Sequence, residues 1–273
     1  MDAGQVRRMI KNGAKRQLGH YLLPCIGVAL IGSVITTLFS VIVTAQMPDA
    51  ETLLKAEDIS AYLPRLGLVY GLSLAFSILI SPLTVGSYAF FAEVSKEGRP
   101  PFSMVFTWLG EGKKMKAAYG ANLWYLLIAV RYMAIFGIPG AAVFYGSALL
   151  FGKIPDGAAI VLYLAAFLVF MALLVCAYAR INAYLPAMYM IAENPKLGIR
   201  ATFSFCGNVM KKRVREFFVF RLSFLAWEIL AAFTCGLSVI YVTPYMNLAV
   251  AGYTQYLKKE ALHEITTKEE PNA

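Results

Sequence analysis

The chain has 273 residues, of which 59% are hydrophobic and 15% are charged, and its mean hydropathy is +0.62. The charges are confined to short segments between long apolar runs, which excludes an ordinary soluble domain. The net charge of +9 could indicate a nucleic-acid partner, but nineteen of the 25 lysines and arginines fall in four clusters that alternate with the apolar runs. Because such alternation is typical of the cytoplasmic face of a membrane protein, we expect no nucleic-acid binding.

The N-terminal segment predicts a basic amphipathic helix. Apolar residues recur every three or four positions between Val6 and Leu18, and five lysines and arginines occupy the other face. Such a helix is expected to lie on a membrane surface. A first span follows from Tyr21 to Ala45, and its length favours a retained anchor over a cleaved signal peptide.

Residues 46–65 predict an outer loop, because they are acidic whereas the segment before the first span is basic. The second span, residues 66–92, begins with Gly67 and Gly71 and then carries a serine at every fourth position up to Pro82. Small residues on one face let helices approach closely, so we interpret this stripe as a packing face. A polar path through the membrane is the alternative.

Residues 93–118 return to the cytoplasmic side and predict a second basic surface helix. The third apolar run, residues 119–150, is interrupted at Gly137-Ile138-Pro139-Gly140, so we expect a kink or a partly re-entrant segment there. The fourth run, residues 157–192, exceeds one crossing, and its cytoplasmic end must therefore tilt, bend or emerge.

A third basic surface helix is predicted to begin after Asn194-Pro195. The last apolar run, residues 217–256, is long enough for a fifth and a sixth span, with a break at Thr234-Cys235-Gly236. Residues 266–273 are expected to form a mobile polar tail.

These elements predict an all-α, polytopic membrane protein with about six transmembrane helices and basic amphipathic interface helices. The odd spans begin about 98 residues apart, and each follows a basic helix. This spacing favours three hairpin units, residues 1–92, 93–192 and 193–257, within one membrane domain of residues 1–265. Since the inner segments hold nineteen lysines and arginines and the outer segments three, both termini are expected to be cytoplasmic.

Several motifs carry a resemblance to a known family. Besides the basic N-terminal helix and an Ile138-Pro139-Gly140 turn, they are Pro82-x-x-x-Gly86-x-Tyr88, Tyr184-x-x-x-Met188-Tyr189-x-Ile191-Ala192-Glu193-Asn194-Pro195, and Leu222-Ser223-Phe224-x-Ala226-Trp227 through Pro244-Tyr245. In these motifs the chain resembles, over nearly its whole length, the bacterial integral-membrane family called domain of unknown function 975. The resemblance implies a multi-pass protein of the bacterial cytoplasmic membrane and supplies no reaction, ligand or catalytic residue.

Arg131 and Glu228 are the main candidates for a polar site within the membrane. Each lies about 11 or 12 residues into a span entered from the cytoplasm, near the midplane, where a charge costs at least ~2.5 kcal/mol. They could form an ion pair that fixes helix packing, or they could belong to a ligand or ion pathway. If Arg180 shares their depth, two arginines face one glutamate, and the remaining positive charge would suit an anionic headgroup or solute. Otherwise Arg180 snorkels to the cytoplasmic interface.

Two asparagines and four prolines are further candidates. Asn182 and Asn247 supply amide groups near helix breaks. Prolines free backbone carbonyls, and broken helices bind substrates in transporters, but prolines are also ordinary in membrane helices. The candidate hinges are Pro82, Pro139, Pro186 and Pro244.

No catalytic motif such as HExxH or GxSxG occurs, so we expect no enzyme, catalytic residue or cofactor. The four cysteines lie far apart, and with two histidines they predict neither a metal site nor a disulfide framework. The expected function is transporter-like or the handling of a lipid or anionic solute. The alternative is a non-enzymatic accessory or scaffold protein of a bacterial membrane complex. Expected partners are the bilayer, with anionic lipid at its cytoplasmic face, and either a membrane protein or a second copy of the chain.

Overall fold

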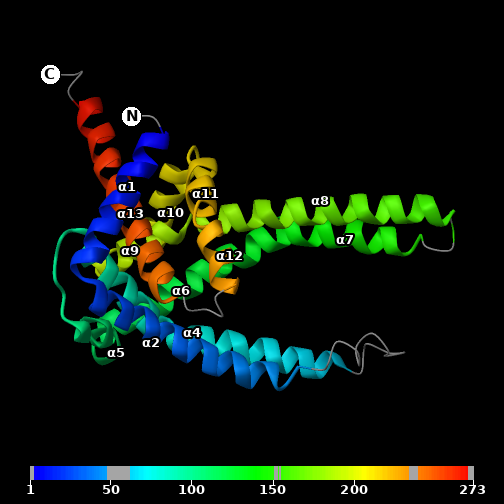
Figure 1. Ribbon diagram of the computed structural model, residues 1–273, viewed down its shortest axis with the longest axis horizontal. Helices are drawn as coiled ribbons and strands as arrows, with labels where there is room; N and C mark the ends of the chain where they lie inside the picture. The colour runs from blue at the N-terminus through cyan, green and yellow to red at the C-terminus, as the bar shows by residue number, and fades with distance from the viewer. Residues whose placement is uncertain (1–2, 48–61, 151–152, 154, 234–238, 270–273) are drawn as a thin grey trace.

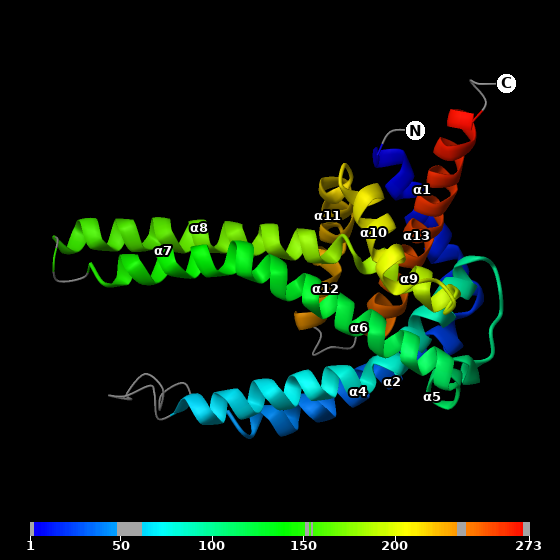
Figure 2. The ribbon, with the colours of Figure 1, turned by 180° about the vertical axis from the view of Figure 1, so that it is seen from behind.

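The structure is a computed structural model that describes residues 3–47, 62–150, 153, 155–233 and 239–269. Within these ranges all regular secondary structure is helical, which confirms the all-α class. Two long hairpin arms project from a body of crossing helices (Figures 1 and 2). The predicted outer loop lies mostly outside the described residues, as does the Thr234-Cys235-Gly236 break.

The first arm pairs α2 (Leu22–Thr44) with α4 (Leu63–Ser95). The rings of Phe39 and Phe76 stack between them with centroids 3.7 Å apart. Helix α4 continues through Pro82 into the body, where its second half is buried. The arm therefore anchors itself in the body by extending one of its own helices.

The second arm consists of a bent helical run and one straight helix. The run comprises α6 (Gly112–Tyr132), a π-helical turn η3 (Met133–Gly137) and α7 (Ile138–Ala148). It changes direction between α6 and α7 (Figure 2). The π-helical turn between them ends at Gly137, the first residue of the Gly-Ile-Pro-Gly sequence where the residue pattern predicted a kink. Helix α8 (Asp156–Asn182) packs along α7 and completes the arm.

The body is built from the inner ends of the arms, helix α1 (Ala3–His20) and the C-terminal helices. These are α9 (Leu185–Glu193), α10 (Ile199–Met210), α11 (Val214–Leu222), α12 (Leu225–Phe233) and α13 (Val239–Glu269). Its core is rich in large aromatic side chains, and Phe217, Phe220 and Tyr253 pack around one another with centroids 4.9–5.9 Å apart. Helix α13 extends to Glu269, into the segment that we predicted to be a polar tail.

Two surface helices differ from the sequence expectation. The apolar face of α1, formed by Val6, Ile10, Ala14 and Leu18, is buried in the hydrophobic core, where α1 packs on α13. The predicted second surface helix is replaced by two short helices, η2 (Phe102–Phe106) and α5 (Thr107–Gly110), before α6 begins. Prolines before η2 and glycines around α5 explain why one continuous helix does not form.

Among the described residues, four helical segments are long and apolar enough to cross a membrane: Leu22–Thr44, Pro64–Ser95, Gly112–Ala148 and Asp156–Glu193. These agree with the first four predicted spans, whereas the predicted fifth and sixth spans are not among them. Helix α12 has only nine residues, about 14 Å, against the ~30 Å of a hydrocarbon core. Helix α13 instead packs against several body helices.

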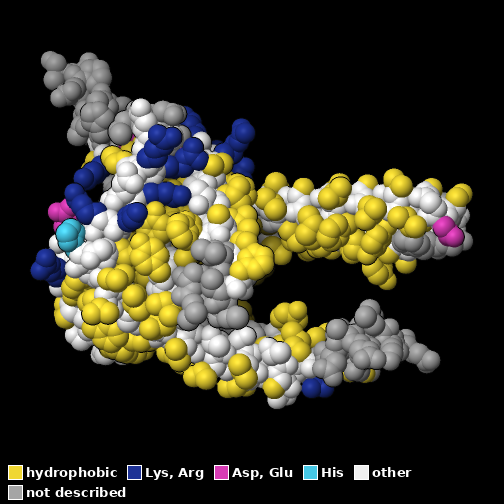
Figure 3. Space-filling view, viewed as in Figure 1, with side chains coloured by type: hydrophobic (Ala, Val, Ile, Leu, Met, Phe, Trp, Pro, Cys, Tyr) yellow, Lys and Arg dark blue, Asp and Glu magenta, His cyan; other side chains and the backbone are white. Residues whose placement is uncertain are grey.

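Apolar side chains cover the arms, whereas charged side chains collect on the body. Leu79 and Leu168 are typical of the arms, with 68% and 67% of their surface exposed. Figure 3 shows this division, with lysines and arginines gathered over the body and yellow side chains along the arms. The arms therefore have the surface expected of lipid-facing helices.

Candidate functional site

A cavity of about 300 Å³ lies where the second arm meets the body, and we call it the second-arm pocket. It brings together the inner ends of α6 and α8 with one face of α10 and the start of α11. Its lining residues are Arg131, Tyr132, Arg180, Ala183, Tyr184, Phe203, Ser204, Gly207, Asn208, Met210, Lys211 and Val214.

The two arginines enter this pocket from the end of α8 and from the point where α6 passes into a π-helical turn. Arg131 lies in the last turn of α6, directly before the π-helical turn, and Arg180 lies in the last turn of α8. Helix α8 stops at Asn182 because Pro186, in the first turn of α9, has no backbone N–H to donate to the Asn182 carbonyl oxygen four residues earlier. Arg180 also interacts favourably with the carbonyl end of the α8 dipole, because it lies in the last turn of that helix.

Aromatic rings form one wall of the pocket. The ring of Tyr184 lies between those of Tyr132 and Phe203, with centroids 6.2 and 6.4 Å away. Gly207 of α10 allows this packing, because a Cβ atom there would be 3.1 Å from the Tyr184 ring and hydroxyl. The wall is therefore fixed by close contact between α10 and the α8–α9 junction.

The pocket has a strongly positive character. Arg131, Arg180 and Lys211 contribute three cations, and no acidic side chain is among the lining residues. None of the three forms an ion pair with another residue in the described part of the chain. Ser204 and Asn208 add neutral hydrogen-bonding groups. Such a set of donors suits an anion.

Cys206 is on α10 near the pocket but is buried away from it. Its thiol donates to the Ala183 carbonyl oxygen at 3.5 Å, and burial raises the pKa of Cys206 to about 12. The thiol therefore stays neutral and adds no negative charge beside the three cations.

The structure brings two of the predicted polar residues together. Arg131 and Arg180 both line the second-arm pocket, Arg131 from the last turn of α6 and Arg180 from the last turn of α8. Glu228 belongs to α12, and its side chain lies outside the described residues, so its predicted pairing with Arg131 stays a prediction.

The two predicted asparagines lie elsewhere. The Asn182 amide donates to the Tyr178 carbonyl oxygen of its own helix at 2.9 Å. Asn247 accepts a hydrogen bond from the Tyr189 hydroxyl at 3.1 Å and lines a separate cavity of about 240 Å³ between α2, α4 and α13. Neither asparagine lines the second-arm pocket.

The predicted hinges fall into two classes. Pro139 and Pro186 occupy the first turns of α7 and α9, immediately after breaks in the helical run. Pro82 and Pro244 lie inside α4 and α13, which continue through them. Only the first two prolines therefore mark ends of helical segments.

Sequence reasoning did not include Lys211 in the site. Its position on the polar side of a predicted surface helix was a usable signal, but the docking of that helix on the base of the second arm is a tertiary contact. Tyr184 and Gly207 were missed for the same reason, since each matters only through the packing of α10 on the α8–α9 junction.

A family model described as "Protein of unknown function (DUF975)" matches residues 1–261. The chain belongs to the DUF975 family. Comparisons with curated proteins and with solved structures gave no match. The match covers both arms, the second-arm pocket and nearly all of the body, so the site lies within the part of the chain that defines a DUF975 protein.

Proposed function

We propose that this DUF975 protein is a multi-pass protein of the bacterial cytoplasmic membrane that binds an anionic lipid by its phosphate group. The observation that carries the proposal is the second-arm pocket, in which Arg131, Arg180 and Lys211 converge without an acidic lining residue. Arginine supports this assignment because its planar guanidinium group can donate two parallel hydrogen bonds to phosphate oxygens.

The position of the pocket along the arm favours a lipid as the source of the phosphate. Arg180 lies 24 positions after Asp156, where α8 begins at the far end of the arm. At about 1.5 Å per residue this is ~36 Å, slightly more than a ~30 Å hydrocarbon core. An arm that crosses the membrane would therefore hold Arg180 at the level of the lipid headgroups.

In this arrangement the two arms span the membrane, and the body with both termini lies on the cytoplasmic side. The basic surface of the body supports this orientation, because lysine and arginine are enriched on the cytoplasmic side of membrane proteins (Figure 3). Helix α12 exposes Leu225, Trp227, Ile229 and Phe233 and is too short to cross. We propose that it enters the inner leaflet instead of forming a fifth span.

The size and chemistry of the pocket favour binding without catalysis. A volume of about 300 Å³ is at the lower end of the range for ligand pockets, about 300–1,000 Å³, and suits a headgroup with its acyl chains outside. The lining residues include neither a carboxylate nor a histidine, the most common general bases.

A lipid titration with matched lysine variants tests the proposal. The thermal unfolding temperature of the purified protein in detergent should rise with phosphatidylglycerol more than with phosphatidylcholine. Lys211→Gln should weaken the apparent affinity for phosphatidylglycerol about fivefold, since one cation near anionic lipid contributes about 1 kcal/mol. Lys212→Gln removes the same charge from the adjacent position, which does not line the pocket, and should have little effect.

Equal losses in the two variants, or equal responses to the two lipids, would contradict a specific site. If the protein instead shows no lipid response and retains one membrane protein in fixed ratio, the accessory or scaffold function is supported in its place.

A further inference from the structure

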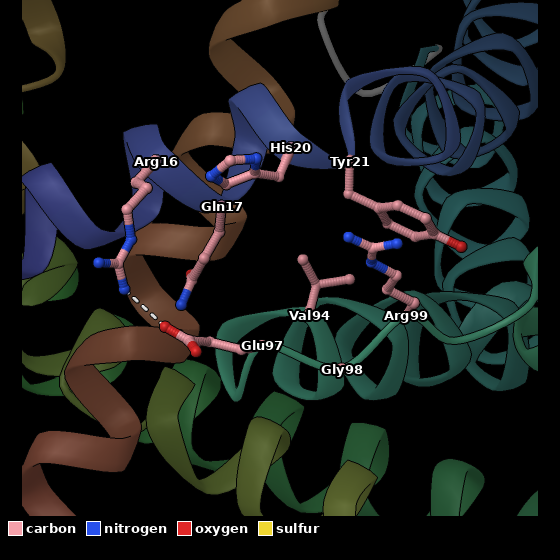
Figure 4. Close-up of a pocket in the computed structure, with 8 residues that line it drawn as sticks. All are labelled: Arg16, Gln17, His20, Tyr21, Val94, Glu97, Gly98 and Arg99. Atoms are coloured by element: carbon pink, nitrogen blue, oxygen red, sulfur yellow. Dashed lines mark hydrogen bonds and ion pairs between the residues drawn. The ribbon is translucent and has the colours of Figure 1, made fainter.

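A second cavity, of about 360 Å³, lies at the inner end of the first arm (Figure 4). We call it the first-arm pocket. It is a depression open to solvent, with the C-terminal end of α1 on one side and the end of α4 with its following loop on the other. Its lining residues are Arg16, Gln17, His20, Tyr21, Val94, Glu97, Gly98 and Arg99.

Two hydrogen bonds fix the walls of this pocket. The Gln17 amide donates to the Ser95 carbonyl oxygen at 2.9 Å, and the Tyr21 hydroxyl donates to the Pro100 carbonyl oxygen at 2.8 Å. Both bonds join the end of α1 to the α4 side of the cavity. The pocket is therefore formed before any ligand arrives, which lowers the entropic cost of binding.

The turn that ends α4 places a carboxylate in the pocket. Glu97 has a positive φ of 67°. Its N–H donates to the Val94 carbonyl oxygen, and the Gly98 N–H donates to the Glu93 carbonyl oxygen, as in a Schellman cap. Glycine is usual at the left-handed position of this cap, and another residue there costs about 1 kcal/mol or more. The Glu97 carboxylate accepts a hydrogen bond from Arg16 Nη2 at 2.5 Å.

Two further side chains of the pocket, Arg99 and His20, lack a carboxylate partner in the described part of the chain. Arg99 and His20 form no hydrogen bond or ion pair with other residues among those that the structure describes. Figure 4 shows His20 on the α1 wall and Arg99 rising from the opposite loop, on either side of the hollow. The pocket thus holds one neutralised arginine, one arginine without a counter-ion and a histidine.

We propose that the first-arm pocket binds a phosphate monoester between Arg99 and His20, with Glu97 acting as an internal anion that occupies Arg16 and limits the affinity. The phosphate monoester is carried either by a lipid such as phosphatidic acid or by a soluble ester. This site is separate from the second-arm pocket and does not depend on the function proposed for it.

The test uses the full chain in nanodiscs of phosphatidylcholine, with glycerol 3-phosphate titrated in a calorimeter. Saturable binding is expected. Arg99→Gln should weaken it about tenfold, because a charge-assisted hydrogen bond to phosphate is lost. Glu97→Gln should strengthen it severalfold, because Arg16 is then free to donate to the ligand. Lys15→Gln removes a charge from α1 at a position that does not line the pocket, and it should leave the affinity for glycerol 3-phosphate unchanged.

The opposite signs expected for Arg99→Gln and Glu97→Gln separate a binding site from a general loss of folding. Nanodiscs that contain phosphatidic acid distinguish the two sources: competition with glycerol 3-phosphate indicates a lipid ligand, and unchanged binding indicates a soluble one. Either result supports the site. Absence of saturable binding in both kinds of nanodisc, or equal losses in Arg99→Gln and Lys15→Gln, would overturn it.

Discussion

Glu193 shows how one side chain can connect the parts of this molecule. Its carboxylate, with only 8% of the side chain exposed, pairs with Lys96 at 3.1 Å and contacts Lys258 and Gln255. Glu193 is the last residue of α9, which follows α8 of the second arm. Lys96 comes directly after α4 of the first arm, and Lys258 and Gln255 belong to α13. A single carboxylate therefore links both arms to the C-terminal helix.

We predict that Glu193→Ala strongly destabilises the protein. The substitution leaves Lys96 and Lys258 close together without the buried carboxylate that they share. The cost is about 2 kcal/mol, because both lysine side chains are partly exposed and solvent screens part of the loss. The thermal unfolding temperature in detergent should fall by roughly 4–8 °C.

Glu93→Ala is the matched control. Glu93 is 3.8 Å from Lys96, but its side chain is 46% exposed, so the pair contributes at most about 1 kcal/mol. Equal effects of the two substitutions would show that Glu193 has no special linking role.

At the same scale, the sequence identified Arg131 and Arg180 because a charge within an apolar run is conspicuous. It could not identify Lys211, which is one of several lysines and arginines on a basic segment. Only the packing of α10 against the base of the second arm distinguishes Lys211 from Lys212.

Among the helices, α4 shows how small residues set a close contact. Gly86 lies against η2, and a Cβ atom at this position would be 2.3 Å from the Val105 carbonyl oxygen. Because the obstructing atom belongs to the backbone, the two elements would have to separate to accept a larger residue. Gly86 is also part of the Pro82-x-x-x-Gly86-x-Tyr88 motif.

We predict that Gly86→Ala destabilises the protein by about 1–3 kcal/mol or more, as expected for overpacking. Gly71→Ala, in the same helix, meets no atom within 4 Å and should leave the stability unchanged or slightly higher, because alanine favours helix. Thermal unfolding of the two variants measures the difference. A Gly86→Ala variant as stable as Gly71→Ala would refute the close contact between α4 and η2.

Helix α1 illustrates the limit of sequence patterns at this scale. Its periodicity correctly predicts an amphipathic helix, but an apolar stripe fits equally well against lipid or against protein. The stripe packs on α13, a contact between the two ends of the chain that no local pattern reveals.

For the whole molecule, the sequence predicted the first four spans closely, because a long continuous apolar run leaves few alternatives. The first, expected from Tyr21 to Ala45, is α2 at Leu22–Thr44. Among the described residues, the predicted fifth and sixth spans form α11, α12 and α13, and none of these helices is both long and apolar enough to count as a span. Helices α11 and α12 have nine residues each, and α13 carries polar side chains such as Asn247 and Gln255 between its apolar residues. A continuous apolar run in the sequence does not show where a helix ends.

The proposed function depends on the two arms crossing the membrane while the body stays in the cytoplasm. Site-directed cysteine labelling in a cysteine-free variant tests this most directly, with a membrane-impermeant maleimide applied to intact cells whose outer layers admit it. Lys153→Cys, near the far end of the second arm, should be labelled in intact cells, and Lys212→Cys, on the body, only after the cytoplasmic membrane is opened. Labelling of both positions from the same side would contradict the account.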